Sequence, residues 1–103
     1  MENDSQEWDS KKAEVNVSKH EGLTFEEAAE VFDDPFALEK FDENHSTIEE
    51  SRYIVIGRIK RQIVTLVVYT PRDNKRRIIS ARYATSIERE AYYDRLRKII
   101  GVQ

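Results

Sequence analysis

The chain contains no cysteine, and it has only three glycines, two prolines and one tryptophan in 103 residues. The absence of cysteine excludes disulfides, thiolate catalysis and cysteine-based zinc sites. No apolar run approaches the roughly 20 residues that a membrane-spanning helix needs, and the acidic, polar N-terminus is unlike a secretory signal. We therefore expect a cytoplasmic protein without membrane contact, with residues 1–6 as a loose end and residues 7–103 as a single domain.

Charge is unevenly distributed along the chain. Residues 1–50 hold four basic and sixteen acidic side chains, a balance of −12, whereas residues 51–103 hold thirteen basic and four acidic ones, a balance of +9. This split predicts a cationic surface on the second half, although the whole chain has a net charge of −3. The alternative is that the two halves fold against each other and neutralise one another.

Capping residues and hydrophobic spacing predict two helices near the N-terminus. Asp9 is a predicted N-cap for a helix that ends near His20, with Ala13, Val17 and also Val15 as its inward-facing residues. Thr24 begins a Thr-x-x-Glu capping box, and the apolar residues that follow it are spaced as on one face of a second short helix.

The remainder of the chain reads as strands followed by one helix. Alternating or continuous apolar residues predict an antiparallel sheet of three to four strands, within the ranges 36–41, 51–60, 62–70 and 75–83. Thr85 and Glu88 form a second capping box, which opens a C-terminal helix to about Ile100. The predicted fold class is α+β.

The most informative stretch is the predicted strand that runs into this last helix. Because side chains alternate along a strand, Ser80 and Arg82 are expected on one face, and Ile79 and Ala81 on the other. A hydroxyl and a guanidinium together, beside the start of a helix, are suited to holding an anion such as phosphate.

Short motifs along almost the whole chain, from about residue 7 to residue 93, carry a family resemblance. They are Trp8-Asp9, Lys12, Asn16, Lys19-His20, Phe25-Glu26-x-Ala28, Phe32-x-Asp34-Pro35, Glu50-x-Arg52, Gly57, Ile79-Ser80-Ala81-Arg82-x-Ala84, Glu88-Arg89 and Tyr92. In this order they resemble the BrnT family, the toxin component of a bacterial type II toxin–antitoxin pair.

The resemblance implies a compact RelE-like fold and cleavage of RNA without a metal ion or other cofactor. It also implies tight binding to a BrnA-type antitoxin, in a hetero-oligomer. The ribbon-helix-helix domain of such an antitoxin binds the operon's own promoter, so the toxin would meet operator DNA only through its partner.

Metal-independent RNA cleavage needs a base for the 2′-hydroxyl, an acid for the leaving oxygen and cations for the phosphorane. Arg82 and Arg52 are the predicted phosphate clamps, because guanidinium binds two phosphate oxygens at once. The alternative for each is an ion pair with a carboxylate. Glu50 is either the general base or the salt-bridge partner of Arg52, and His20 is either a proton-transfer group or a helix cap.

Other polar residues are weaker candidates. Lys12 and Lys19 share a helix face and would extend a phosphate track, whereas the alternative is a solvated face. Trp8 is a stacking platform for a base or a packing anchor, and Ser80 binds phosphate or its own backbone. His45, with Glu49 four residues on, is only a weak metal motif and is more typical of a solvated loop histidine.

Two classes of function follow. The first is a metal-independent ribonuclease toxin held inactive by an antitoxin. The second is a non-catalytic RNA- or protein-binding module, including a degenerate toxin that keeps its partner surface and has lost its activity. The two classes differ in whether Glu50 or His20 lies within proton-transfer reach of Arg52 and Arg82.

Overall fold

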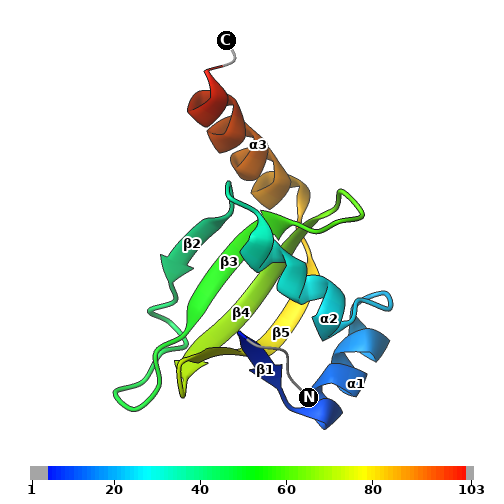
Figure 1. Ribbon diagram of the computed structural model, residues 1–103, viewed down its shortest axis with the longest axis vertical. Helices are drawn as coiled ribbons and strands as arrows, with labels where there is room; N and C mark the ends of the chain where they lie inside the picture. The colour runs from blue at the N-terminus through cyan, green and yellow to red at the C-terminus, as the bar shows by residue number, and fades with distance from the viewer. Residues whose placement is uncertain (1–4, 102–103) are drawn as a thin grey trace.

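The computed structural model describes residues 5–101, and its elements are arranged around one mixed sheet (Figure 1). In chain order they are β1 (Gln6–Trp8), α1 (Ser10–Lys19), α2 (Phe25–Ala28), the 3₁₀ helix η1 (Ala29–Asp33), β2 (Leu38–Phe41), β3 (Tyr53–Arg58), β4 (Val64–Arg72), β5 (Lys75–Tyr83) and α3 (Ser86–Ile100). The five strands lie in the order β1-β5-β4-β3-β2. The α+β class is confirmed, whereas the predicted sheet of three to four antiparallel strands was one strand short.

The missing strand is β1, at the edge of the sheet. Gln6, Glu7 and Trp8 pair in parallel with Arg76, Arg77 and Ile78 of β5. Three residues carry too little alternation to predict a strand, and their pairing partner lies about 70 residues away in the chain. Gln6, which was predicted to belong to a loose end, is thus part of β1, and residues 1–4 lie outside the described residues.

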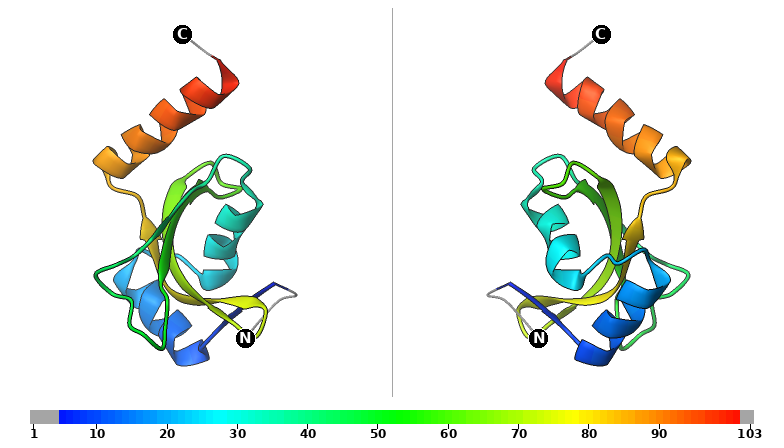
Figure 2. Two further views of the ribbon diagram at one scale, coloured as in Figure 1. Left: turned by 90° about the vertical axis from the view of Figure 1, so that its left-hand side faces the viewer. Right: turned by 90° about the vertical axis from the view of Figure 1, so that its right-hand side faces the viewer.

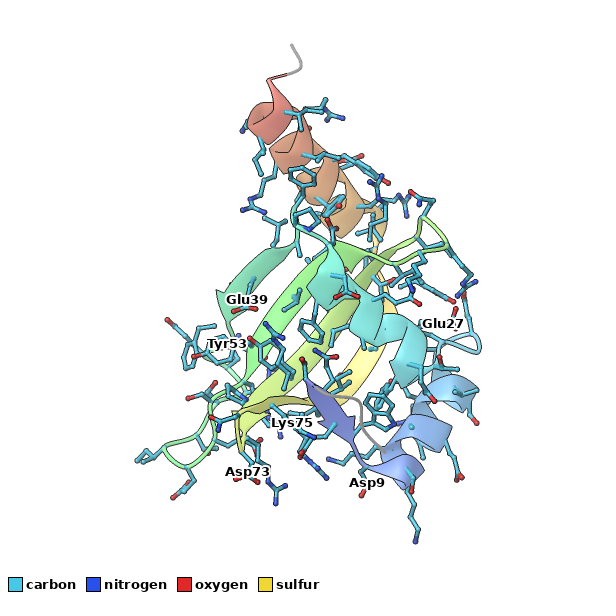
Figure 3. All side chains as sticks on the ribbon, in the orientation of Figure 1. Asp9, Glu27, Glu39, Tyr53, Asp73 and Lys75 are labelled. Carbon is cyan, nitrogen blue, oxygen red and sulfur yellow. The ribbon has the colours of Figure 1, made fainter. Side chains whose placement is uncertain are left out.

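The hydrophobic core fills the space between the sheet and the α2–η1 segment. Figure 2 shows α2 and η1 on one face of the sheet, with α1 and the loop of residues 42–52 on the other. The buried apolar cluster comprises Trp8, Leu23, Phe25, Ala28, Ala29, Val31, Val55, Ile59, Val67, Tyr69, Ile78 and Ala81. At its margin Tyr53 stacks on Tyr69, with ring centroids 5.5 Å apart. Figure 3 shows Tyr53 and Glu39 on this same face.

Gly57 lets β3 approach η1 closely. A Cβ atom at this position would lie 3.1 Å from the Cβ of Val31 and 3.2 Å from the Cβ of Ala37. These distances are tighter than ordinary carbon contacts, so any side chain at residue 57 would push the 3₁₀ helix off the sheet.

Helix α1 packs against the core through Ala13, as predicted, but not through the two valines predicted to face inward. Asp9 is its N-cap as predicted, with its carboxylate accepting from the backbone N–H groups of Lys11 and Lys12. Val15 and Val17, however, are 50% and 37% exposed. The only buried residue of the helix is Asn16. It accepts from the Ala81 N–H at 3.1 Å and donates to the Leu23 carbonyl at 3.3 Å.

The second predicted helix is shorter than its pattern suggested. Thr24 caps it as predicted, with its hydroxyl accepting from the Glu27 N–H at 3.0 Å. Only Phe25–Ala28 is α-helical, and the chain then tightens into the 3₁₀ turns of η1. The apolar spacing therefore spans two helix types, which a pattern of buried residues does not distinguish.

A β-bulge in β5 alters the predicted alternation. Val68 pairs with Ser80, but the next residue, Tyr69, pairs with Ile78, so Ile79 is the extra residue. Ile78 and Ala81 are both buried in the core although they are three positions apart. Ile79 lines the opposite face together with Ser80, which corrects the expectation that Ile79 and Ala81 share a face.

Helix α3 begins at the predicted capping box and then leaves the body of the domain. Thr85 and Glu88 exchange both capping hydrogen bonds. Tyr92 is buried and donates to a carboxylate oxygen of Asp34 at 2.5 Å, which anchors the first half of the helix. The second half extends beyond the sheet (Figures 1 and 2). Over residues 5–101, no helix has the length and apolarity that crossing a membrane requires.

Candidate functional site

A groove of about 500 Å³ lies on the face of the sheet that α2 and η1 do not cover. Two rows of cross-strand neighbours form its base, because alternate residues of paired strands line the same face. One row runs Lys40, Ile54, Val68, Ser80, and the next runs Leu38, Ile56, Leu66, Arg82. The floor is thus aliphatic in the central strands, and the polar residues of the two rows stand at the sides.

Arg82 lies at one side of the groove in a bidentate ion pair. Its two terminal nitrogens contact the two carboxylate oxygens of Glu88 at 2.8 and 2.9 Å. The Arg82 guanidinium holds the pKa of the Glu88 carboxyl at about 2, well below its usual range, although partial burial acts in the opposite direction. Glu88 also accepts from the Thr85 N–H, so one carboxylate joins the end of β5 to the start of α3.

Arg52 lines the groove from the other side, just before β3, and it too has a carboxylate partner. Its Nε donates to Glu50 at 2.9 Å, and both side chains are partly exposed. In this structure each of the two arginines is therefore in an ion pair with a carboxylate, which was the alternative to a free phosphate clamp. Glu50 is not among the residues that line the groove.

His20 and Ser80 line both the groove and a second, smaller hollow. His20 is the C-cap of α1, where its backbone N–H donates to the Asn16 carbonyl. The second hollow is lined by Lys12 and Lys19 together with His20, Ile79 and Ser80. The two lysines of the predicted phosphate track therefore adjoin the groove.

Trp8 is placed away from the groove. It is 5% exposed and belongs to the core cluster, with its ring 6.2 Å from that of Phe25 in an edge-to-face arrangement. The structure shows the packing anchor rather than a platform on which a base stacks.

Four charged or titratable residues that were not predicted as site residues also line the groove: Lys40, Asp42, His45 and Glu88. In the sequence, Glu88 stands out as a helix-capping residue and as part of a family motif, and His45 only as a loop histidine or weak metal motif. His45 Nδ1 in fact contacts Asp42 Oδ2 at 2.8 Å. The signal that could have found this pair is the i, i+3 spacing of Asp and His immediately after a strand.

The charge split between the halves is partly neutralised by folding. Glu7 pairs with Arg77 at 2.8 Å, and Glu27 pairs with Arg61 at 2.7 Å. The groove retains both signs of charge, because its three cations share the lining with Asp42 and Glu88. Within residues 5–101, no cluster of three or more histidine and acidic side chains is arranged to hold a metal ion.

Comparison with known proteins agrees with this architecture. Residues 8–88 match the family model described as the ribonuclease toxin BrnT of type II toxin–antitoxin systems. The fold is similar to the 1.1 Å crystal structure of the Brucella abortus ribonuclease toxin BrnT, with a TM-score of 0.56 and 23% sequence identity, over 80% of this chain and 99% of that one. No curated protein sequence matches the chain. Since the family model spans most of its length, the chain belongs to the BrnT family of ribonuclease toxins of type II toxin–antitoxin systems.

Proposed function

We propose that the protein is a metal-independent endoribonuclease that acts in the cytoplasm and cleaves RNA by attack of a 2′-hydroxyl on the adjacent phosphorus. The observation that carries this proposal is the groove on the open face of the sheet, which is lined by Arg52, Arg82 and His20. A groove with an arginine at each side and an aliphatic floor suits a single strand of RNA, whose backbone is anionic and whose unstacked bases are apolar on their faces.

Six of the predicted site residues have a role in this proposal. Arg82 and Arg52 would bind the phosphate oxygens and stabilise the charge of the phosphorane, with Ser80 as a further donor. His20 would protonate the leaving 5′-oxygen. Lys12 and Lys19 would bind the neighbouring phosphates, because their hollow continues from the groove past His20 and Ser80.

The test is incubation of the purified protein with single-stranded RNA, with and without a metal chelator. Cleavage that resists the chelator and leaves 2′,3′-cyclic phosphate ends supports the proposal. The Arg82→Ala variant should cleave about 100-fold more slowly, since one donor to a developing oxyanion is worth that much. Intact RNA in the presence of measurable binding would sink the proposal.

Two control variants separate the loss of the Arg82 guanidinium from the loss of its ion pair and from the loss of one positive charge. Glu88→Gln breaks the same ion pair as Arg82→Ala but leaves the arginine in place, so it should retain cleavage. Arg72→Ala removes the same charge from an exposed position at the end of β4, outside the groove, and should also retain cleavage. Equal losses in all three variants would point to general destabilisation or to bulk charge.

A second function, a non-catalytic binding module, is favoured by one observation. Both arginines are already engaged by carboxylates, Arg82 through its whole terminal fork. A phosphate of RNA must displace Glu88 before it can bind the two terminal nitrogens of Arg82. Chelator-independent binding without cleavage, together with RNA affinity that rises in Glu88→Gln, would identify the protein as such a module.

The proposed partner is a BrnA-type antitoxin with a ribbon-helix-helix domain, encoded by the adjacent gene. Co-expression should yield a stable hetero-oligomer in which RNA cleavage is suppressed. Promoter DNA should be retarded by that complex and not by the toxin alone. The absence of a small ribbon-helix-helix protein from the operon would count heavily against the pairing.

A further inference from the structure

The loop between β2 and β3, residues 42–52, is closed by hydrogen bonds at its base. The Asp42 N–H donates to the Arg52 carbonyl at 2.8 Å, and the Arg52 N–H donates to the Ser46 hydroxyl at 2.9 Å. That hydroxyl in turn donates to the Asp42 carbonyl at 2.6 Å. This network links both ends of the loop through Ser46 and holds Asp42 and Arg52 beside each other at the edge of the groove.

Asp42 and His45 form a pair of unequal exposure within this loop. Asp42 is only 8% exposed, whereas the His45 side chain is 67% exposed and lines the groove. The contact to Asp42 is made by His45 Nδ1, at 2.8 Å. The opposite ring nitrogen, Nε2, is therefore on the side of the imidazole that faces away from the buried carboxylate.

This arrangement has the form of an oriented base. A carboxylate that accepts from Nδ1–H selects the tautomer in which Nε2 carries the lone pair, and it stabilises the imidazolium that forms when Nε2 takes a proton. Glu50, the other candidate base, is bound to Arg52 and does not line the groove. The charged and titratable groups that share the groove with His45 are Lys40, Asp42, Arg52, His20, Arg82 and Glu88.

We propose that His45 is the general base of the RNA cleavage and that Asp42 is its positioning residue; this inference rests on the proposed ribonuclease function. His45 Nε2 takes the proton of the 2′-hydroxyl as the 2′-oxygen forms its bond to phosphorus. The bond from phosphorus to the 5′-oxygen breaks, and that oxygen takes a proton from His20. The products are a 2′,3′-cyclic phosphate and a 5′-hydroxyl, and both histidines return to their starting states by exchange with water.

The test is single-turnover cleavage of a single-stranded RNA by the full chain, measured as a function of pH. His45→Gln should slow cleavage about 100-fold, the usual contribution of a general base, with RNA affinity unchanged within about threefold. The limb of the wild-type pH profile that reports the deprotonated general base should disappear in this variant. Glu43→Gln, an exposed substitution in the same loop, is the matched control and should change neither quantity.

Two further measurements separate catalysis from a structural role of the loop. Free imidazole should restore part of the cleavage in His45→Ala, which a merely structural histidine would not allow. Asp42→Asn should shift the acidic limb of the pH profile and reduce the rate, while Asp42→Glu should recover part of it.

The outcomes distinguish this inference from the function on which it rests. If Arg82→Ala loses cleavage but His45→Gln keeps the wild-type rate and pH profile, the base is elsewhere and the ribonuclease function stands. If the wild-type protein binds RNA and never cleaves it, both proposals fall together. Thermal melting of each variant checks that the fold is intact, which is expected for the exposed His45.

Discussion

The two faces of the sheet are built from the same strands, yet they have opposite properties. On the face covered by α2 and η1, Val55, Val67 and Ala81 are neighbours across three strands and are buried. On the other face the adjacent rows, which contain Ile54 and Ile56, form the floor of an open groove bordered by charged side chains. The comparison shows how one set of strands supplies both a packed core and an open, charged groove, since neighbouring residues point to opposite faces.

Charged side chains also have different kinds of partner on the two faces. Near the covered face, Asp34 is tied into the fold by the Tyr92 hydroxyl and by the backbone N–H groups of Arg58 and Phe36. Burial by itself raises the pKa of Asp34, but these hydrogen bonds outweigh it and lower that pKa. On the open face the charged groups pair with one another at the surface, where a substrate can compete for them.

The largest expected effect tests whether stability is concentrated on the covered face. Phe25 is completely buried, so Phe25→Ala should lower the free energy of unfolding by about 3–5 kcal/mol. Ile54→Ala, on the half-buried groove floor, should lower it by only about 1 kcal/mol. Urea denaturation of both variants measures the contrast. Equal losses would mean that the groove floor is packed as tightly as the core.

A smaller effect on stability is expected at Asn16, whose side chain links α1 to the backbone of β5. Asn16→Ala leaves the buried Ala81 N–H without its side-chain acceptor, at a cost of about 2 kcal/mol in the free energy of unfolding. Asn44→Ala, at an exposed loop position, is the control and should cost almost nothing. An Asn16→Ala variant as stable as the wild type would show that α1 is held by other contacts.

The smallest expected effect on stability concerns the ion pair of the open face. Glu88→Gln should cost about 1–2 kcal/mol at neutral pH, a value reduced from the full pKa shift because Arg82 is partly exposed. The pKa of Glu88 is lowered from 4.5 to about 2 by folding, so its contribution is complete above pH 4.5 and is lost as the pH falls toward 2. Denaturation curves of the two proteins should therefore converge in acid. A gap that stays constant from neutral pH to about pH 3 would contradict this assignment.

Local patterns predicted the features that depend on neighbouring residues. The caps at Asp9, Thr24 and Thr85 are confirmed, because each is made within four residues of the chain. The failures occurred where distant segments meet. Asn16 replaced Val17 as the buried residue of α1 because the Ala81 N–H and the Leu23 carbonyl require a polar partner there. The bulge at Ile79 arises from the register with β4, which no alternation within β5 reveals.

The same distinction applies to the candidate site. Arg82, Ser80 and Arg52 could be proposed from strand alternation and residue chemistry, and the structure places all three along one groove. The Asp42–His45 pair could not be proposed with equal force, because its importance comes from the burial of Asp42 and from the neighbouring strands. The pairing of Arg82 with Glu88 likewise depends on how the chain turns between β5 and α3.

Spacing, capping and composition were sufficient to predict the α+β class, the helix starts and the excess of basic residues in the second half. The three-dimensional arrangement of the chain was needed to show which face of the sheet stays open and which carboxylate each arginine meets. It also decided that a loop histidine faces the groove. Those outcomes depend on contacts between residues far apart in the chain, and their energies are set by burial and distance rather than by residue type.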